Sequence, residues 1–536
     1  MDQETLRTTE GVIVFLAGKV DEDAERVLAM VDVLVADTFG ESPRPLDVEE
    51  AATLMNAAGV LINAAGRASS PEGLRTGEEW MVTVVDSGLL AGSQFESSAL
   101  YNLANSRIAI ADLNAERAMR YAEEGHQIRA NVDSRFADRE ALRRARSDLA
   151  AGVSLATDSR QRGMLLCNLA NTLDNSGRWV EAYDAYARAL EADPENGNAA
   201  GNAALLIERV IAAGWDFEGH LCTLYDYYLS HAKANRAGTV AVAGEGAARR
   251  FDQMKLLGTD QPVVARRDSE DPYRAWVIRH RLALVAALEG LGSNRHEGRW
   301  DTISLPSVTD SSDQTSPPVI FAILNVLKAD YLVARRLAFE AEQMIEETGG
   351  WAQHRDDPGV YTETLDYAVY GEISSKLVLA HRAALDVLDK TAVAVNEHLQ
   401  MGDSPRAVSF RKFWFEGKDG AALRSGLMRY EGLVTAVLSM SELAADMAKD
   451  SLYGHAQDVR NAGTHRFVLV HQGMTDVEST VTMQAITLDA MRESCRQSLT
   501  VARAAFLYLV SLLEMFEARS SEDSDLAIPL FLPDVL

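Results

Sequence analysis

The chain of 536 residues is too long for one hydrophobic core, so roughly two to four domains are expected. It has 47% hydrophobic and 24% charged residues, as globular proteins do, and its formal net charge of −27 argues against nonspecific nucleic-acid binding over the whole surface. The start MDQETLR is acidic, and no apolar run reaches about 18 residues, so we expect a cytoplasmic protein with no membrane partner. The three cysteines are scattered and lack metal or redox spacing, so we expect a reduced protein with no metal or cofactor.

Hydrophobic residues recur with helical spacing along most of the chain, which predicts an all-α fold. Residues 1–90 are the least defined, and VIVFLAG at 12–18 fits either a strand or a buried helix segment. The clearest pattern is at 165–196, where two predicted helices flank the turn NSGR. Gly177 there can adopt a left-handed conformation, and Pro194 ends the second helix. Its apolar and small residues match the tetratricopeptide (TPR) pattern: Leu166, Leu169, Ala170, Leu173, Ala182, Tyr186 and Ala189.

The pattern repeats at TPR spacing. The interval from Asn168 to Asn202 equals the length of one TPR repeat, and YNLANS at 101–106 resembles CNLANT at 167–172 at close to two repeat lengths. We expect one strong repeat and several degraded ones, which together form a TPR-like helical solenoid over residues 1–300. Such solenoids usually bind a protein or peptide on the concave face. The alternative is a helical scaffold without a ligand.

A domain boundary is predicted where the composition changes. Residues 304–319, SLPSVTDSSDQTSPPV, are rich in Ser, Thr, Asp and Pro, so 301–318 is interpreted as a linker or loop. A second domain is expected over 319–517, followed at 518–536 by an acidic and then apolar tail that docks onto the protein or a partner. Its helices are predicted near residues 319–347, 361–400, 421–449, 458–472 and 476–517.

The segment DVRNAGTHRF at 458–467 holds the main candidate for catalysis. Arg460 carries a guanidinium that can bind a phosphate, and His465 carries an imidazole that can move protons near neutral pH. Four arginine–histidine pairs in the chain have similar spacing, but only Arg460 is followed by a polar amide, that of Asn461. Residues 401–475 hold nine Lys or Arg against eight Asp or Glu, so the acidic excess lies elsewhere. The alternative is an exposed helix arginine and a partly buried histidine with structural roles.

RNAGTHR at 460–466 resembles the Arg-Asn form of the signature of HEPN ribonucleases, the higher eukaryotes and prokaryotes nucleotide-binding superfamily. Segments 324–342, 383–399 and 408–415 also look like the HEPN subgroup found behind TPR-like repeats, and the resemblance covers roughly 319–517. It implies a compact all-helical bundle that acts as a metal-independent endoribonuclease, normally a homodimer with a shared cleft. It further implies a role in toxin–antitoxin systems or antiviral defence.

The spacing of the motif favours a site completed by a second chain. At about 100° per residue, an offset of five places Arg460 and His465 about 140° apart on a straight helix. Two such helices crossing at a twofold axis would bring both pairs into one groove, although a site within one chain stays open. Because glycine is unfavourable inside a helix, the motif is expected near a helix start, with Asp458 as N-cap.

The predicted chemistry follows from these side chains. His465 would act as general base toward the ribose 2′-hydroxyl, and Arg460 would stabilise charge on the phosphate. Asn461 would orient the phosphate or His465 by hydrogen bonding. The expected products are a 2′,3′-cyclic phosphate and a 5′-hydroxyl. Further candidate phosphate contacts are Arg466, Lys328, Arg335 and Lys390, but for the last three a solvated surface or structural pairing is the favoured interpretation.

Two other classes of function stay open. In the first, the chain is a non-enzymatic adaptor, in which the repeats bind a protein and the C-terminal helices only dimerise. In the second, it is a regulator that binds nucleotides without cutting RNA. The sequence identifies neither the RNA target nor the trigger.

Overall fold

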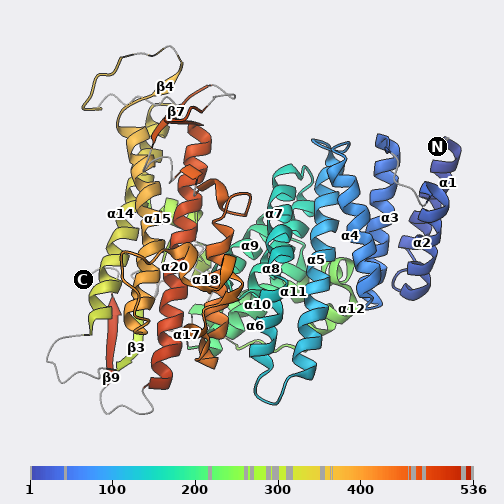
Figure 1. Cartoon of the computed structure of the whole chain (residues 1–536), viewed down its shortest axis with the longest axis horizontal. Helices are drawn as coiled ribbons and strands as arrows, with labels where there is room; N and C mark the ends of the chain where they lie inside the picture. The colour runs from blue at the N-terminus through green and yellow to red at the C-terminus, as the bar shows by residue number, and fades with distance from the viewer. Residues whose placement is uncertain are drawn as a thin grey trace. The chain divides into compact units, whose positions relative to one another are not determined.

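The computed structural model describes residues 3–40, 45–214, 220–258, 264–265, 271–284, 291–292, 301–309, 318–349, 357–362, 364, 366–456, 458–459, 466–473, 479–520 and 527–532. The fold is all-α, as predicted, with short strands in the second half (Figure 1). Two compact units divide the chain. The first contains Met1–Ser176, Ala185–Leu205 and Tyr228–Lys255, and the second contains Gly177–Asp184, Leu206–Tyr227 and Leu256–Leu536.

The N-terminal half of the chain forms a series of helices. They are α1 (Gln3–Ala17), α2 (Ala24–Phe39), α3 (Val48–Arg67), α4 (Pro71–Asp86), α5 (Gln94–Tyr121), α6 (Gln127–Ala137), α7 (Arg139–Leu155), α8 (Ser159–Asn175), α9 (Trp179–Ala192), α10 (Gly197–Ala212), α11 (His220–Ala234) and α12 (Arg236–Gln253). The segment VIVFLAG, for which strand and helix were both open, lies largely in α1.

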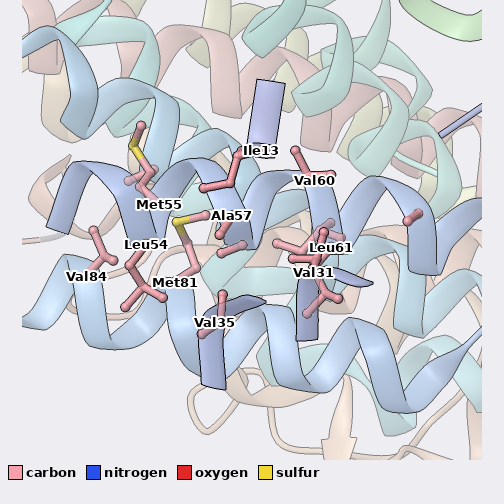
Figure 2. Packing of buried hydrophobic residues seen from close by; sticks show 14 of the residues in the cluster. Ile13, Val31, Val35, Leu54, Met55, Ala57, Val60, Leu61, Met81 and Val84 are labelled. Atoms are coloured by element: carbon pink, nitrogen blue, oxygen red, sulfur yellow. The ribbon is translucent and has the colours of Figure 1, made fainter. Parts of the chain in front are cut away.

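The N-terminal core is built around α3. Asp47 and Glu50 form a capping box at its start, with Glu50 N–H donating to Asp47 Oδ1 at 2.9 Å. Many of its buried residues are alanines, and they pack with valines, leucines and methionines of α1, α2 and α4 (Figure 2). Gly77 permits the close approach of α4, because a Cβ atom there would lie 2.5 Å from Ile62 Cγ1. Small residues therefore set the spacing of this helix pair.

The best predicted repeat forms a helical hairpin. Helices α8 and α9 flank the turn at Gly177, whose φ of +75° is the left-handed conformation that favours glycine. Hydrogen bonds between asparagines join α8 to α5 and to α10. Asn168 Nδ2 in α8 donates to Asn105 Oδ1 in α5 at 2.7 Å, and Asn202 Nδ2 in α10 donates to Asn171 Oδ1 in α8 at 2.9 Å. The predicted pair of helices is confirmed, while the identification as a TPR unit stays a prediction.

Three long helices form the body of the second unit. Helices α14 (Val319–Glu347), α15 (Glu372–His398) and α20 (Leu488–Ser520) lie side by side (Figure 1). Helix α18 (Val434–Asp446) packs against α20. The smaller elements are β1 (Val264–Ala265), α13 (Pro272–Arg279), β2 (Leu291–Gly292), α16 (Phe410–Phe413), β5 (Phe415–Glu416), η2 (Lys418–Gly420), β6 (Ala422–Leu423), α17 (Ser425–Met428) and η3 (Glu431–Leu433).

Four small sheets lie in the described part of the second unit, and the two larger ones correct several sequence predictions. Strand β3 (Ile303–Thr309) pairs antiparallel with β9 (Ala527–Leu532), so the prediction of a linker over 301–318 is wrong for 303–309, and part of the tail 518–536 docks onto the protein. Strands β4 (Ala368–Val369), β7 (Phe467–His471) and β8 (Met483–Thr487) form the other sheet, in the order β4-β7-β8. Helix was therefore wrongly predicted at 368–369, 467–471 and 483–487. Residues 310–317 lie outside the described residues.

Helix α20 is central to the packing of this unit. Within the part of the chain that the structure describes, it alone is long and apolar enough to cross a membrane, over Leu488–Ala518. However, 78% of its most apolar stretch is buried inside the protein, where it packs against α14, α15 and α18. Burial by protein on several sides is typical of the core helix of a bundle.

Candidate functional site

The motif residues Arg460, Asn461 and His465 lie outside the described residues, which stop at Val459 and resume at Arg466. What the structure provides is the geometry of the two segments that flank the motif. The first, residues 447–459, is called here the lead-in segment; its residue 457 is not described. The second begins at Arg466 and continues as β7.

The lead-in segment is fixed to the helical bundle. Ala456 is fully buried and Val459 is 2% exposed. His381 of α15, itself fully buried, places Nε2 at 2.9 Å from the Ala456 carbonyl oxygen and Nδ1 at 3.2 Å from that of Ser494 in α20. This one ring therefore connects α15, the lead-in segment and α20. A neutral ring donates only one N–H, so the tautomer decides which carbonyl accepts it.

The local structure before the motif differs from the prediction. Residues 454–456 and 458–459 are helical, so Asp458 lies among helical residues and is not the N-cap that was expected there. Tyr453 N–H donates to the carbonyl oxygen of Asp446 at 2.8 Å, which closes the turn between α18 and these residues. The described residues before the motif are therefore helical, with Ala456 and Val459 buried and His455 and Asp458 exposed.

The segment after the motif is a strand. Phe467 N–H donates to the Thr482 carbonyl oxygen at 2.9 Å, and β7 runs parallel to β8 and antiparallel to β4. The residues FVLVH are aromatic or β-branched for the most part, which favours an extended backbone over the predicted helix. His471 at the strand end is buried, and its Nδ1 lies 2.9 Å from the Asp366 carbonyl oxygen. Both sides of the motif are therefore held by packed structure, and Arg466, half-buried, directly precedes the strand.

Lys328 and Arg335, two of the other candidate phosphate contacts, are engaged within the protein. Lys328 in α14 is 8% exposed, and its Nζ donates to the Leu532 carbonyl oxygen of β9 at 3.2 Å. Arg335 is 3% exposed and binds Asp301 through two hydrogen bonds of 2.7 and 2.6 Å. Burial disfavours the charged guanidinium, but Asp301 outweighs it and raises the pKa of Arg335. These positions favour structural pairing, the alternative already preferred for both residues.

Lys390 occupies a different environment. Its Nζ forms an ion pair with Asp330 Oδ2 at 2.5 Å, and 49% of its side chain is exposed. An exposed pair of this kind contributes little to stability and can exchange partners readily. Of these three cations, Lys390 is the one that a polyanion could reach without disrupting buried structure.

A buried ionic cluster was missed by the sequence analysis. Arg178 donates Nε to Glu181 Oε2 at 2.8 Å and also binds Asp446, the last residue of α18. Two tyrosine hydroxyls complete the cluster by donating to Glu181: Tyr453 to Oε1 at 2.5 Å and Tyr508 of α20 to Oε2 at 3.0 Å. Each of these five side chains is at least nine-tenths buried.

The charges in this cluster stabilise one another. Burial alone would disfavour the guanidinium, but Glu181 and Asp446 raise the pKa of Arg178 well above its ordinary value. Burial and the nearby Glu181 carboxylate raise the pKa of Tyr453 well above 10, so this hydroxyl stays protonated and donates. No sequence signal pointed to the cluster, because RWVEA at 178–182 looks like the turn of an ordinary helical repeat.

Comparison with known families supports the assignment of the C-terminal part. Residues 311–515 match the family model described as LA2681-like HEPN. The matched range contains α14, α15, α18, most of α20 and the motif at 460–466, and it supports a HEPN domain within an all-α protein. The match does not extend to the N-terminal helices. No curated protein matches the chain.

Proposed function

We propose that the chain is a metal-independent endoribonuclease. The observation that carries this proposal is the LA2681-like HEPN match over 311–515, because that range includes Arg460, Asn461 and His465. The packed segments on both sides support it. The lead-in segment is tied to α15 and α20, and a strand starts at Phe467, so the described residues on both sides of the motif are held in place, and catalysis by positioned groups needs such a frame.

In the proposed reaction, His465 removes the proton from a ribose 2′-hydroxyl, whose oxygen then attacks the adjacent phosphorus. The bond from phosphorus to the 5′-oxygen breaks, and the leaving oxygen takes up a proton. The products are a 2′,3′-cyclic phosphate and a 5′-hydroxyl. Arg460 stabilises the charge that develops on the phosphate oxygens, and Asn461, which cannot exchange protons at neutral pH, orients the phosphate or the imidazole.

The test is RNA cleavage by the purified full chain in EDTA. His465→Ala and Arg460→Ala should each lower kcat by about 10²- to 10⁴-fold, the range typical of a lost general base or charge stabiliser. His455→Ala is a matched control, because His455 is exposed on the same segment and lies outside the motif. Arg411→Ala serves the same purpose for arginine. A substrate with one 2′-deoxyribose at the cleavage position should resist.

Full cleavage by both motif variants would refute the proposal. A wild-type protein that binds a partner but cleaves no RNA would instead support the adaptor. Stabilisation by nucleotides without cleavage would support the nucleotide-binding regulator. Tests on tRNA, rRNA and mRNA would then define the substrate class.

We further propose that the site is shared within a homodimer. The sequence offset of five between Arg460 and His465 supports it, because on a straight helix that offset would correspond to about 140°. So does Phe467, which is 75% exposed beside Met483 at 41% and directly follows the motif. Mixing Arg460→Ala with His465→Ala protein is a direct test. If the two residues act across chains, mixed dimers regain one intact site and part of the activity returns. Without any recovery, despite subunit exchange measured by native mass spectrometry, the shared site would be wrong.

The proposed biological role is a toxin-like or antiviral defence effector whose TPR-like repeats bind a protein or peptide and regulate cleavage. The all-helical N-terminal unit supports a repeat function. The negative net charge of the chain repels RNA, which fits a protein whose RNA cleavage is inhibited until a trigger binds. A chain lacking residues 1–155 should cleave RNA faster than the full chain if the repeats inhibit. Equal rates in the two proteins would contradict this regulation.

A further inference from the structure

We infer that Arg178 and Glu181, from the turn at Gly177 and the start of α9, are positioning residues for the ribonuclease motif. This inference rests on the proposed function and adds a means of regulation to the same site. The turn belongs by sequence to the best predicted repeat, at 165–196, yet Gly177–Asp184 form part of the same compact unit as the C-terminal helices. The connection between this turn and the motif is the buried ionic cluster.

The cluster holds the lead-in segment through two residues. Arg178 pairs with Asp446, the last residue of α18 directly before the segment, and the Asp446 carbonyl oxygen accepts the N–H of Tyr453 at 2.8 Å. Further along, the hydroxyl of Tyr453 donates to Glu181 Oε1 at 2.5 Å. Tyr453 precedes the motif closely in sequence, and Ala456 and Val459, which stand between it and Arg460, are buried. The position of the segment that enters the motif is therefore set partly by a turn that lies far upstream in the sequence.

The geometry of the cluster suits a contact that holds the lead-in segment in place and can also release it. Arg178 binds Glu181 with two nitrogens, Nε at 2.8 Å and Nη2 at 2.5 Å, so the carboxylate that receives Tyr453 has a fixed orientation. The whole cluster is buried, so its charges must stay paired. Displacement of the segment that carries both Arg178 and Glu181 would leave Asp446 buried without its cation and the Tyr453 hydroxyl without its acceptor. Two states, engaged and disengaged, are therefore favoured over a gradual shift.

A change in the repeats can reach the motif by this route. Helix α9 starts in the second unit at Trp179 and continues through Ala185–Ala192, which count with the first unit. A ligand that alters the repeat hairpin acts on the helix that carries Glu181. The class of regulation implied is control of RNA cleavage through the lead-in segment, independent of any contact between ligand and RNA.

The test uses Tyr453→Phe in the full chain, which removes one hydroxyl and leaves Glu181 paired with Arg178. Tyr331→Phe is the matched control: it removes a buried hydroxyl of α14 that donates to the Leu282 carbonyl oxygen at 2.7 Å, and Leu282 is not one of the five residues of the cluster. We expect Tyr453→Phe to lower kcat by about 10- to 100-fold with KM unchanged. Tyr331→Phe should leave both constants near wild type, and the two variants should lose thermal stability to a similar extent.

Hydrogen exchange separates this inference from the proposed function. Peptides covering 447–459 should exchange faster in Tyr453→Phe and in Glu181→Gln, and at the wild-type rate in Tyr331→Phe. The double variant should show no more than the larger single effect, because both changes break the same contact. If the wild-type chain cleaves no RNA but exchange changes in this way, the proposed function fails and the positioning role stands. Unchanged exchange in Tyr453→Phe, or equal loss of kcat in Tyr331→Phe, would overturn the inference.

Discussion

Replacing Arg335 with methionine would decide whether this arginine serves the fold or the substrate. The guanidinium holds Asp301 through two hydrogen bonds of 2.7 and 2.6 Å, donates to the Leu282 carbonyl oxygen at 2.8 Å and donates to the Tyr273 hydroxyl at 2.9 Å. Leu282 keeps a second donor, the hydroxyl of Tyr331, so its carbonyl would stay satisfied. Asp301 would retain only the N–H of Leu284 among these contacts.

The expected cost is that of a buried carboxylate without its cation. Breaking such a pair from one side typically costs about 3–5 kcal/mol. With an unfolding entropy of about 2.1 cal/mol/K per residue and roughly 300 residues in the second unit, each kcal/mol lowers Tm by about 1.5 °C, so Arg335→Met should lower the melting temperature of this unit by roughly 5–8 °C. Arg335→Lys keeps the charge but loses the two-pronged contact, and it should cost less.

The assay is thermal unfolding followed by calorimetry, which resolves separate transitions in a chain of two units. The double variant Arg335→Met with Asp301→Leu removes both charges and should recover most of the lost stability. RNA affinity should be unchanged in any variant that stays folded. A melting temperature within about 2 °C of wild type for Arg335→Met, together with weakened RNA binding, would refute the structural assignment.

Two further variants test the second unit. Burial and the nearby Arg496 and Arg279 lower the pKa of His280 to about 4, whereas the pKa of this histidine in the unfolded chain is about 6.5. The unfolded chain therefore binds the proton at a higher pH than the folded chain, and stability should fall as the pH drops from about 6.5 toward 4. In unfolding measured across this range, His280→Gln should flatten the decrease, and an unchanged slope would contradict the assignment. Leu530→Ala in β9, at a side chain 7% exposed, should cost about 2–5 kcal/mol. Phe531→Ala, at a side chain 57% exposed on the same strand, is its control and should cost about 0.5 kcal/mol or less, whereas equal losses would show that β9 does not contribute to the core as described.

The helices were predictable because their signal is local. The apolar spacing at 165–196 and the turn NSGR with Gly177 indicated two helices and a turn, and α8 and α9 confirm them. Strands were not predicted where a short run rich in β-branched residues lies between helices. The run at 467–471 is too short for periodicity to separate strand from helix, and its partner β8 begins only at Met483, so no hairpin turn joins the two in sequence.

The candidate site was predictable only in part. The HEPN match covers the motif that residue chemistry and family resemblance singled out. The environment of the surrounding cations was not predictable, because Lys328 and Lys390 look alike on an amphipathic helix until their partners are known. Lys328 donates to a carbonyl of the distant strand β9, whereas Lys390 pairs at the surface with Asp330. Long-range partners such as Asp446 for Arg178 leave no trace in local spacing.

The discontinuous second unit has a consequence for how such chains can be recombined. Because Gly177–Asp184 and Leu206–Tyr227 belong with Leu256–Leu536, no single cut separates the two units. A genetic crossover placed between residues 256 and 445 would join one parent's Arg178 and Glu181 to another parent's Asp446 and Tyr453. Chimeras are therefore expected to keep this ionic cluster intact when the break lies before residue 177, because Arg178, Glu181, Asp446 and Tyr453 then come from the same parent.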